Sequence, residues 1–155
     1  MTAVAACTFC EIARGAADAY VICRDELVIA FLDLHPIRPA HVLVVSVEHH
    51  AYFEDLPAAT SARVMHVGQL LAGIMKRTYG VPRVAFVFTG DQIAHAHAHV
   101  VPMVDDTDVT SRRYIVEAHV TFAPAPAARA ADLAATAARL RAALDSRGRR
   151  DSALC

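Results

Sequence analysis

The chain has 155 residues, enough for one domain that buries its own hydrophobic core without disulfides. Its formal net charge is −1, and charged residues make up 20% of it, so it lacks the basic excess that drives binding to a nucleic acid polymer. Its β-branched run at residues 41–47 is far too short to span a bilayer. We therefore expect a small polar ligand, with neither nucleic acid nor membrane as a partner.

Four cysteines bear on the compartment and on metal binding. Cys7 and Cys10 form a C-x-x-C pair, whereas Cys23 and Cys155 stand apart in the sequence. Residues 1–6 carry no basic charge and do not resemble a secretory signal, so we expect a cytoplasmic protein. In a reducing compartment a C-x-x-C pair indicates either a metal site or a redox pair.

The first part of the chain predicts one short helix and three strands. The helix is expected over residues 7–14, ending at Gly15, and two strands over residues 19–23 and 27–33 form a hairpin. Two prolines then interrupt regular structure. A buried central strand over residues 41–47 follows, and it begins at His41.

The second part predicts two helices and further strands. A helix over residues 55–79, capped by Asp55 or Thr60 and ended by Gly80, precedes antiparallel strands over residues 84–88 and 93–103. One more strand is expected over residues 114–122, then an amphipathic helix over residues 128–144. The predicted class is α+β: an antiparallel sheet of about five strands, with a long helix packed on it and a C-terminal helix.

Three histidines alternate with small residues at His95, His97 and His99. On a β-strand alternate side chains share a face, so the three imidazoles are expected in a row on one surface. Such a row suits catalysis or metal binding.

The triad occurs together with three upstream elements, and the combination is specific. The residues that carry the likeness are His95-x-His97-x-His99-Val100-Val101, Phe31-Leu32-Asp33, Pro39-Ala40-His41 and Cys7-x-Phe9-Cys10. The chain resembles the histidine-triad (HIT) superfamily over residues 7–104. The resemblance implies a homodimeric α+β enzyme that acts at the α-phosphorus of a nucleotide. From the resemblance together with the element pattern, we expect a catalytic domain at residues 1–122, a proline-containing linker at 123–127, and a C-terminal helix with a frayed tail at 128–155.

The resemblance also implies roles for single residues. His97 matches the family's nucleophile, and His99 and His41 match histidines that line the α-phosphate. Neutral imidazole is nucleophilic near neutral pH without a separate base. The predicted ribose and base contacts are Asp33 for the ribose hydroxyls and Phe9 and Phe31 for the base, although core packing explains the two phenylalanines equally well.

The turn at residues 89–92 departs from the family pattern, because it is shorter than the usual glycine-rich turn. Asp91 or Gln92 occupies the position of the family's glutamine. A carboxylate near the phosphate would repel it, so either Gln92 and backbone amides make the phosphate contact or activity is reduced.

A structural zinc site is the second implication. By resemblance, Cys7 and Cys10 are completed by His49 and His95, with the adjacent His50 as the alternative ligand. A redox role for the two cysteines is the competing interpretation, which lacks a thioredoxin-like βαβ setting.

The function expected from these residues is hydrolysis at the α-phosphate of nucleoside phosphoramidates or dinucleoside polyphosphates, with a purine nucleotide as substrate and a nucleotidyl-histidine intermediate. Nucleotidyl transfer to phosphate through the same intermediate is the first alternative. A slow nucleotide-binding regulatory module is the second. His66 is expected outside the site, and His35 and His119, which have no motif support, are expected at the surface.

Overall fold

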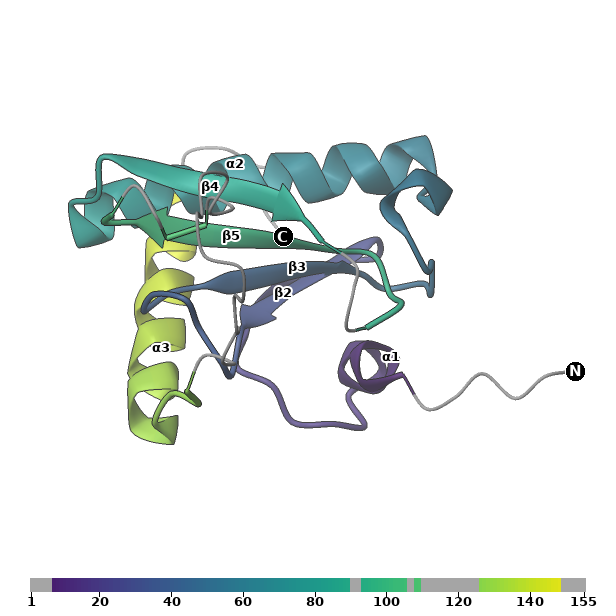
Figure 1. Ribbon diagram of the computed structural model, residues 1–155, viewed down its shortest axis with the longest axis horizontal. Coiled ribbons are helices and arrows are strands. Elements are labelled where there is room, and N and C mark those ends of the chain that lie inside the picture. Colours follow the sequence, from purple (N-terminus) through teal and green to yellow (C-terminus); the bar gives the residue numbers. More distant parts are fainter. Residues whose placement is uncertain (1–6, 90–92, 106–107, 110–125, 149–155) are drawn as a thin grey trace, which may run out of the picture.

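The computed structural model describes residues 7–89, 93–105, 108–109 and 126–148 (Figure 1). Its helices are α1 (Thr8–Arg14), α2 (Ala58–Tyr79) and α3 (Ala130–Gly148), with a 3-10 turn η1 (Phe53–Asp55). Its strands are β1 (Val21–Arg24), β2 (Val28–Leu32), β3 (Val42–Ser46), β4 (Arg83–Phe88) and β5 (His97–Met103). The predicted α+β class, with a sheet of five strands, is confirmed.

The sheet is antiparallel, and its strand order is β1-β2-β3-β5-β4. β5 therefore lies between β3 and β4, with Leu43 of β3 opposite His99 of β5. Because β2, β3 and β5 alternate in direction, the loop after β2 and the loop after β5 lie at one end of the sheet. The end of β3 and the start of β5 lie at the opposite end.

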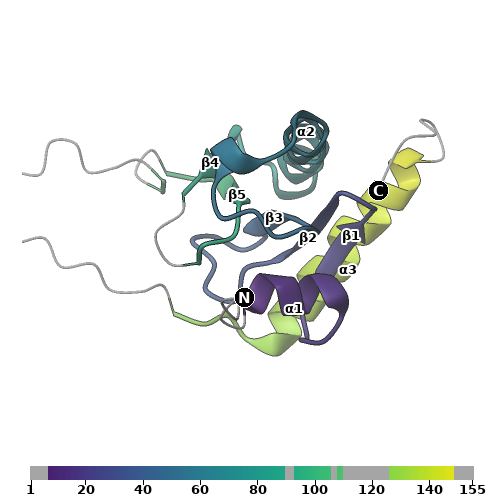
Figure 2. The ribbon, with the colours of Figure 1, turned by 90° about the vertical axis from the view of Figure 1, so that its right-hand side faces the viewer.

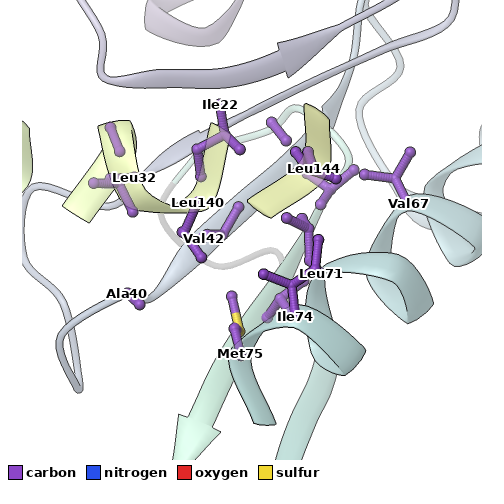
Figure 3. Close-up of a cluster of buried hydrophobic side chains, with 14 of the residues drawn as sticks. Ile22, Leu32, Ala40, Val42, Val67, Leu71, Ile74, Met75, Leu140 and Leu144 are labelled. Atoms are coloured by element: carbon purple, nitrogen blue, oxygen red, sulfur yellow. The ribbon is translucent and has the colours of Figure 1, made fainter. Parts of the chain in front are cut away.

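Each face of the sheet carries its own hydrophobic cluster. One cluster joins the strands to α2 and α3 (Figure 3). Its sheet residues include Ala98 and Val100 of β5. The other joins the opposite face to Phe9 and Ile12 of α1. Because side chains alternate along β5, His97 and His99, which flank Ala98, face the side of α1.

The long helix α2 covers the first face with a regular apolar stripe. Val64, Val67, Leu71 and Ile74 are each no more than 1% exposed, at the spacing the sequence predicts. The helix ends at Gly80, whose φ of 64° is the left-handed conformation expected there.

The predicted cap of α2 is wrong. The helix begins at Ala58 after Pro57, and no side chain caps it. Asp55 belongs to the preceding 3-10 turn, and Thr60 lies inside the first helical turn, where it is buried. The fixed φ of proline suits a helix start, so α2 begins after Pro57 and not at Asp55 or Thr60.

The C-terminal helix α3 packs into the first cluster through Leu133, Ala137, Leu140 and Leu144 (Figure 3). It contacts α2, β1 and β2 and lies steeply across the direction of α2 (Figure 1). Figure 2 shows α2 end-on, with α3 passing beside β1. Edge strand β1 is therefore covered by a helix.

The histidine strand is shorter than predicted, because β5 starts at His97 and not at residue 93. Residues 93–96 turn instead: the N–H of His95 donates to the carbonyl of Ile93, and that of Ala96 to the carbonyl of His50. Pro102 lies inside β5 and pairs with β4. Proline is tolerated there because the pairing with β3 ends at Val100, so no bond from a Pro102 N–H is missing on that side.

Some predicted segments lie outside the described residues: the strand at 114–122, most of the linker at 123–127 and the tail beyond residue 148. No described helix combines the length and the apolar character needed to cross a membrane.

Candidate functional site

A cavity of about 530 Å³ opens between α1, the β2–β3 loop and β5. This volume lies in the range of roughly 300–1,000 Å³ that small-molecule sites occupy. Its apolar part includes Phe9, Ile12 and Phe31. Its polar part holds Asp33, Thr89 and the imidazoles of His41, His97 and His99. One side of the cavity thus suits a flat apolar group, and the other an anion.

His97 is held by its own backbone neighbour. Its Nδ1 lies 2.6 Å from the carbonyl oxygen of His95. A carbonyl can only accept, so Nδ1 carries the proton and Nε2 carries the free lone pair. The ring is 6% exposed and packs against the edge of Phe9 at 5.1 Å between centroids. His97 therefore has one oriented nucleophilic nitrogen.

A second chain of hydrogen bonds fixes two other imidazoles. The Ile37 N–H donates to His41 Nδ1 at 3.3 Å, which makes that nitrogen an acceptor in the neutral ring and leaves the proton on Nε2. His41 Nε2 then donates to His99 Nδ1 at 2.9 Å. His99 Nε2 consequently donates to Thr89 Oγ1, also at 2.9 Å. The ring protons of His41 and His99 therefore both have a defined place.

His41 is kept neutral by its surroundings. Burial lowers its pKa, and the nearby Asp33 carboxylate, 3.6 Å from Nδ1, opposes that shift only in part. The ring is 2% exposed, and the prediction that a proline-rich loop delivers it to the start of a strand is confirmed.

Asp33 and the two phenylalanines all line the cavity. One Asp33 oxygen, Oδ1, accepts from the His35 N–H at 2.8 Å, and the carboxylate is only partly buried. Phe9 and Phe31 contact each other edge-on at 5.6 Å and belong to the second hydrophobic cluster. Both interpretations of the phenylalanines, core packing and base contact, are compatible with this position.

The ligand atoms of Cys7, Cys10, His49 and His95 lie within 4.8 Å of one another. Cys7 Sγ is 3.3 Å and Cys10 Sγ 3.5 Å from His95 Nδ1, and Cys10 Sγ is 3.3 Å from His49 Nδ1. Sulfur and nitrogen bound to one tetrahedral zinc stand about 3.5 Å apart. The four residues therefore fit a zinc ion.

Ser46 orients one of these ligands. Its carbonyl accepts from His95 Nε2 at 2.9 Å, so the lone pair of His95 is on Nδ1 and faces the cysteines. Burial lowers the pKa of His95, which keeps the ring neutral, as metal binding requires. Burial and the nearby Cys7 raise the pKa of Cys10, which disfavours its thiolate. A cation bound beside the sulfur would favour the thiolate again.

The alternative ligand His50 does not join the cluster. Its Nε2 lies 3.9 Å from a Glu48 oxygen, and its backbone carbonyl accepts a hydrogen bond from the Ala96 N–H. His49 instead points to Cys10. The two adjacent histidines thus diverge, as expected on an extended chain.

Two residues that position the imidazoles, Thr89 and Ser46, were not predicted from the sequence, and two predicted phosphate contacts lie outside the described residues. Thr89 and Ser46 carry no motif of their own, and the only signal was their proximity in sequence to His41, His49 and the triad. Asp91 and Gln92 lie outside the described residues, as does His119. His66 is exposed on α2, away from both clusters. His35 is exposed as predicted, but it also lines the cavity.

Comparisons with known proteins agree with this arrangement. The family model of the HIT domain matches residues 14–106. An uncharacterized HIT-like protein of Borreliella burgdorferi is 30% identical over 103 residues, covering 62% of this chain and 74% of its own. Adenosine 5′-monophosphoramidase HNT1 of Saccharomyces cerevisiae is 29% identical over 103 residues, or 66% of this chain and 65% of its own.

A solved structure extends the likeness to nearly the whole chain. The zinc-bound histidine triad family protein of Mycobacterium smegmatis superposes with a TM-score of 0.73 and 26% identity, covering 94% of this chain and 98% of its own. Since the family model spans more than half of the sequence and the fold agrees, the chain belongs to the HIT domain family.

Proposed function

We propose that this protein hydrolyses nucleoside phosphoramidates or related nucleotidyl conjugates, with a purine nucleotide as the favoured substrate and His97 as its nucleophile. The observation that carries the proposal is the free Nε2 of His97, left as the acceptor by the bond from Nδ1 to the His95 carbonyl, on a ring that lines the cavity. The name of the yeast relative, an adenosine 5′-monophosphoramidase, supports the substrate class.

In this reaction His97 Nε2 attacks the α-phosphorus, and the bond from phosphorus to the leaving group breaks. The leaving group departs with the bonding electron pair and takes a proton. Water then attacks the nucleotidyl-histidine, which releases the nucleoside monophosphate and restores the imidazole. The Nε2 proton of His99, which bonds Thr89 in the structure, would turn to a phosphoryl oxygen when substrate binds, while His41 holds the His99 ring in place through Nδ1.

The remaining contacts follow from the shape of the cavity. Asp33 offers a carboxylate to the two ribose hydroxyls, and Phe9 and Phe31 offer apolar surface to the base. The phosphate would then lie against the imidazoles. A nucleotide thus fits with its apolar and charged parts against matching walls.

Zinc is the proposed metal, held by Cys7, Cys10, His49 and His95. With four protein ligands the site is closed, so the ion would be structural and would not activate water. The cysteines precede or begin α1, His49 follows β3 and His95 precedes β5. A zinc ion therefore links three separate segments next to His97. Reduced cysteines of this kind suit the cytoplasm.

The test compares wild type with His97→Ala and with His66→Ala, whose ring is exposed on α2. We expect wild type to release AMP from an adenosine phosphoramidate, and His97→Ala to lose roughly a thousandfold or more of kcat while still binding AMP. His66→Ala should match wild type. Undiminished turnover by His97→Ala would overturn the proposal, and binding without turnover by wild type would favour the regulatory module.

Transfer to phosphate uses the same first step and differs only in the acceptor. Hydrolysis predicts that added inorganic phosphate leaves AMP as the product, whereas a phosphorylase would convert the nucleotidyl group into ADP. Product analysis over a range of phosphate concentrations distinguishes the two reactions.

We further propose that two copies associate along β4. α3 covers the edge strand β1, whereas β4 forms the other edge of the described sheet. Beside β4, the ring of Phe53 contacts Phe88 and is 57% exposed. An open edge with exposed aromatic side chains favours pairing with another chain. Light scattering should give twice the mass of the chain, and Phe53→Asp should lower it; a monomeric wild type would contradict this.

A further inference from the structure

An ion pair joins two loops at one end of the sheet. Arg38, in the β2–β3 loop, donates from Nε and Nη2 to Asp108 Oδ1 at 2.8 and 2.6 Å. Asp108 lies in the segment after β5, 70 residues further along the chain. Charge-assisted bonds of this length are the stronger kind of hydrogen bond.

Asp108 also fastens its own loop. Its second oxygen, Oδ2, accepts from the backbone N–H groups of Val104 and Asp105, each at 2.9 Å. The side chain is only 6% exposed, whereas that of Arg38 is 37% exposed. A carboxylate so well enclosed needs a counter-charge, and Arg38 holds its pKa well below the usual range. The Asp108 end of the pair is thus enclosed and held by three donor groups, whereas the Arg38 end reaches the surface.

The backbone of the same loop holds His41 on two sides. The carbonyl of Arg38 accepts from the His41 N–H at 3.0 Å, and the N–H of Ile37 reaches His41 Nδ1 at 3.3 Å. The peptide that joins Ile37 to Arg38 therefore lies between these two contacts. Displacement of Arg38 would alter both the place of the ring and the acceptor role of its Nδ1.

Other contacts secure the rest of the loop. Its ends are tied where the Asp33 N–H donates to the His41 carbonyl at 3.0 Å. The Ala128 N–H holds the carbonyl of Leu34 at 2.9 Å. These bonds fix the base and the first half of the loop, while the Arg38 side chain ties the second half to the segment after β5.

We propose that Arg38 and Asp108 form a positioning pair that fixes His41 in the cavity, with Nδ1 against the Ile37 amide and Nε2 toward His99. Its effect on catalysis rests on the proposed function, but its effect on the His41 ring does not. The pair touches neither the nucleophile nor any proposed zinc ligand in the described contacts. It therefore acts through His41, not on the substrate directly.

The variants Arg38→Ala and Asp108→Ser, singly and together, test the pair. Serine keeps an oxygen for the Val104 and Asp105 amides but cannot carry the charge, so the turn is retained. Arg38→Lys keeps the positive charge with fewer directed donors. Arg129→Ala is the matched control, because it removes an ion pair with Asp132 at the start of α3. The side chains of Arg129 and Asp132 are 82% and 54% exposed.

Kinetics with an adenosine phosphoramidate give the first readout. We expect each single variant to lose about tenfold in kcat with little change in KM, because a small displacement of an active-site group is costly. The double variant should lose no more than either single one, since both break the same contact. Arg38→Lys should fall between wild type and Arg38→Ala, and Arg129→Ala should equal wild type.

¹⁵N NMR of the histidine rings gives the second readout and needs no turnover. In Arg38→Ala and Asp108→Ser the two nitrogen shifts of His41 should move toward each other, as the ring begins to exchange tautomers, while those of His97 stay unchanged. Unaltered His41 shifts in both variants would overturn the proposal, even if the protein had no activity. So would losses that multiply in the double variant, which would mean that the residues act separately.

Discussion

The imidazoles of His41 and His99 share one hydrogen bond, with 2.9 Å between Nε2 of the first and Nδ1 of the second, although 58 residues separate them in the chain. The bond joins the strand that follows the proline loop to the strand of the triad. Only one of its two nitrogens can carry the proton. Because the Ile37 amide already donates to Nδ1 of His41, the shared proton is on Nε2 of His41. This sets the donor and the acceptor in each hydrogen bond that follows.

This arrangement predicts the tautomers of three histidines. His41 and His99 should carry their protons on Nε2, whereas His97 should carry its proton on Nδ1 and leave Nε2 free. Long-range ¹H–¹⁵N NMR spectra of the labelled protein near pH 7.5 measure each ring directly. A proton on Nε2 of His97 would contradict the assignment of that nitrogen as nucleophile, because its lone pair would then be absent.

Metal content and stability should both depend on the Cys/His cluster. We expect wild type to carry one zinc ion per chain and Cys10→Ser to lose it, and the free energy of unfolding of Cys10→Ser should be lower by about 3 kcal/mol, since zinc binding contributes directly to folding. Cys23→Ala is the control, because Cys23 lies on β1 outside the cluster. Elemental analysis and urea unfolding measure the two quantities. Equal zinc in wild type and Cys10→Ser would refute the proposed ligand set.

The Arg38–Asp108 pair predicts a pH dependence of stability. Arg38 lowers the pKa of Asp108 in the folded protein below its unfolded value of about 3.9. A group with a lowered folded pKa stabilises the protein above its unfolded pKa, and this stabilisation is lost as the pH falls through the folded value. Wild type should therefore lose more unfolding free energy than Arg38→Ala when the pH is lowered from 6 to 3. Equal losses in the two proteins would exclude the pair as a source of stability. Release of a bound zinc ion at low pH would lower the stability of both proteins by the same amount.

Packing between α2 and β4 limits substitution at Gly68. A Cβ atom there would lie 2.4 and 2.7 Å from two carbons of the Phe86 ring, closer than van der Waals contact permits. Gly68→Ala should lower the free energy of unfolding by about 1 kcal/mol. Overpacking against Phe86 should cost about 2 kcal/mol, which exceeds the gain in helix propensity of about 1 kcal/mol. In a Phe86→Ala background the same change should stabilise the helix. Urea unfolding of the four proteins measures the difference, and a stabilising effect in wild type would show that the ring moves freely.

Local patterns predicted most of the elements in this chain. Gly15 and Gly80 end their helices in the left-handed conformation, and the β-branched run after His41 forms the buried central strand. These features depend on residues close together in sequence, where backbone sterics and side-chain alternation decide the outcome.

The site was predictable in its residues and less so in its geometry. Alternation alone would have placed all three triad histidines on one strand, yet His95 precedes β5 and its ring reaches the cysteines. The turn that allows this depends on a bond from Ala96 to the carbonyl of His50, which no local pattern reveals.

Long-range polar contacts were the least accessible from the sequence. Arg38 and Asp108 are 70 residues apart, and Thr89 is 10 residues from His99. Such partners meet only after the strands have paired, because the sheet order brings their loops to one place. Their chemistry is visible in the sequence, but their pairing is not.

The measurement that tests the central claim most directly is peptide mapping by mass spectrometry after a single turnover of an adenosine phosphoramidate, quenched at alkaline pH to preserve a phosphorus–nitrogen bond. We predict one adenylyl group on His97 in wild type, transient in time, and none in His97→Ala. Release of AMP by wild type with the adduct on another residue, or with no adduct at any time, would contradict the assignment of His97 as the nucleophile.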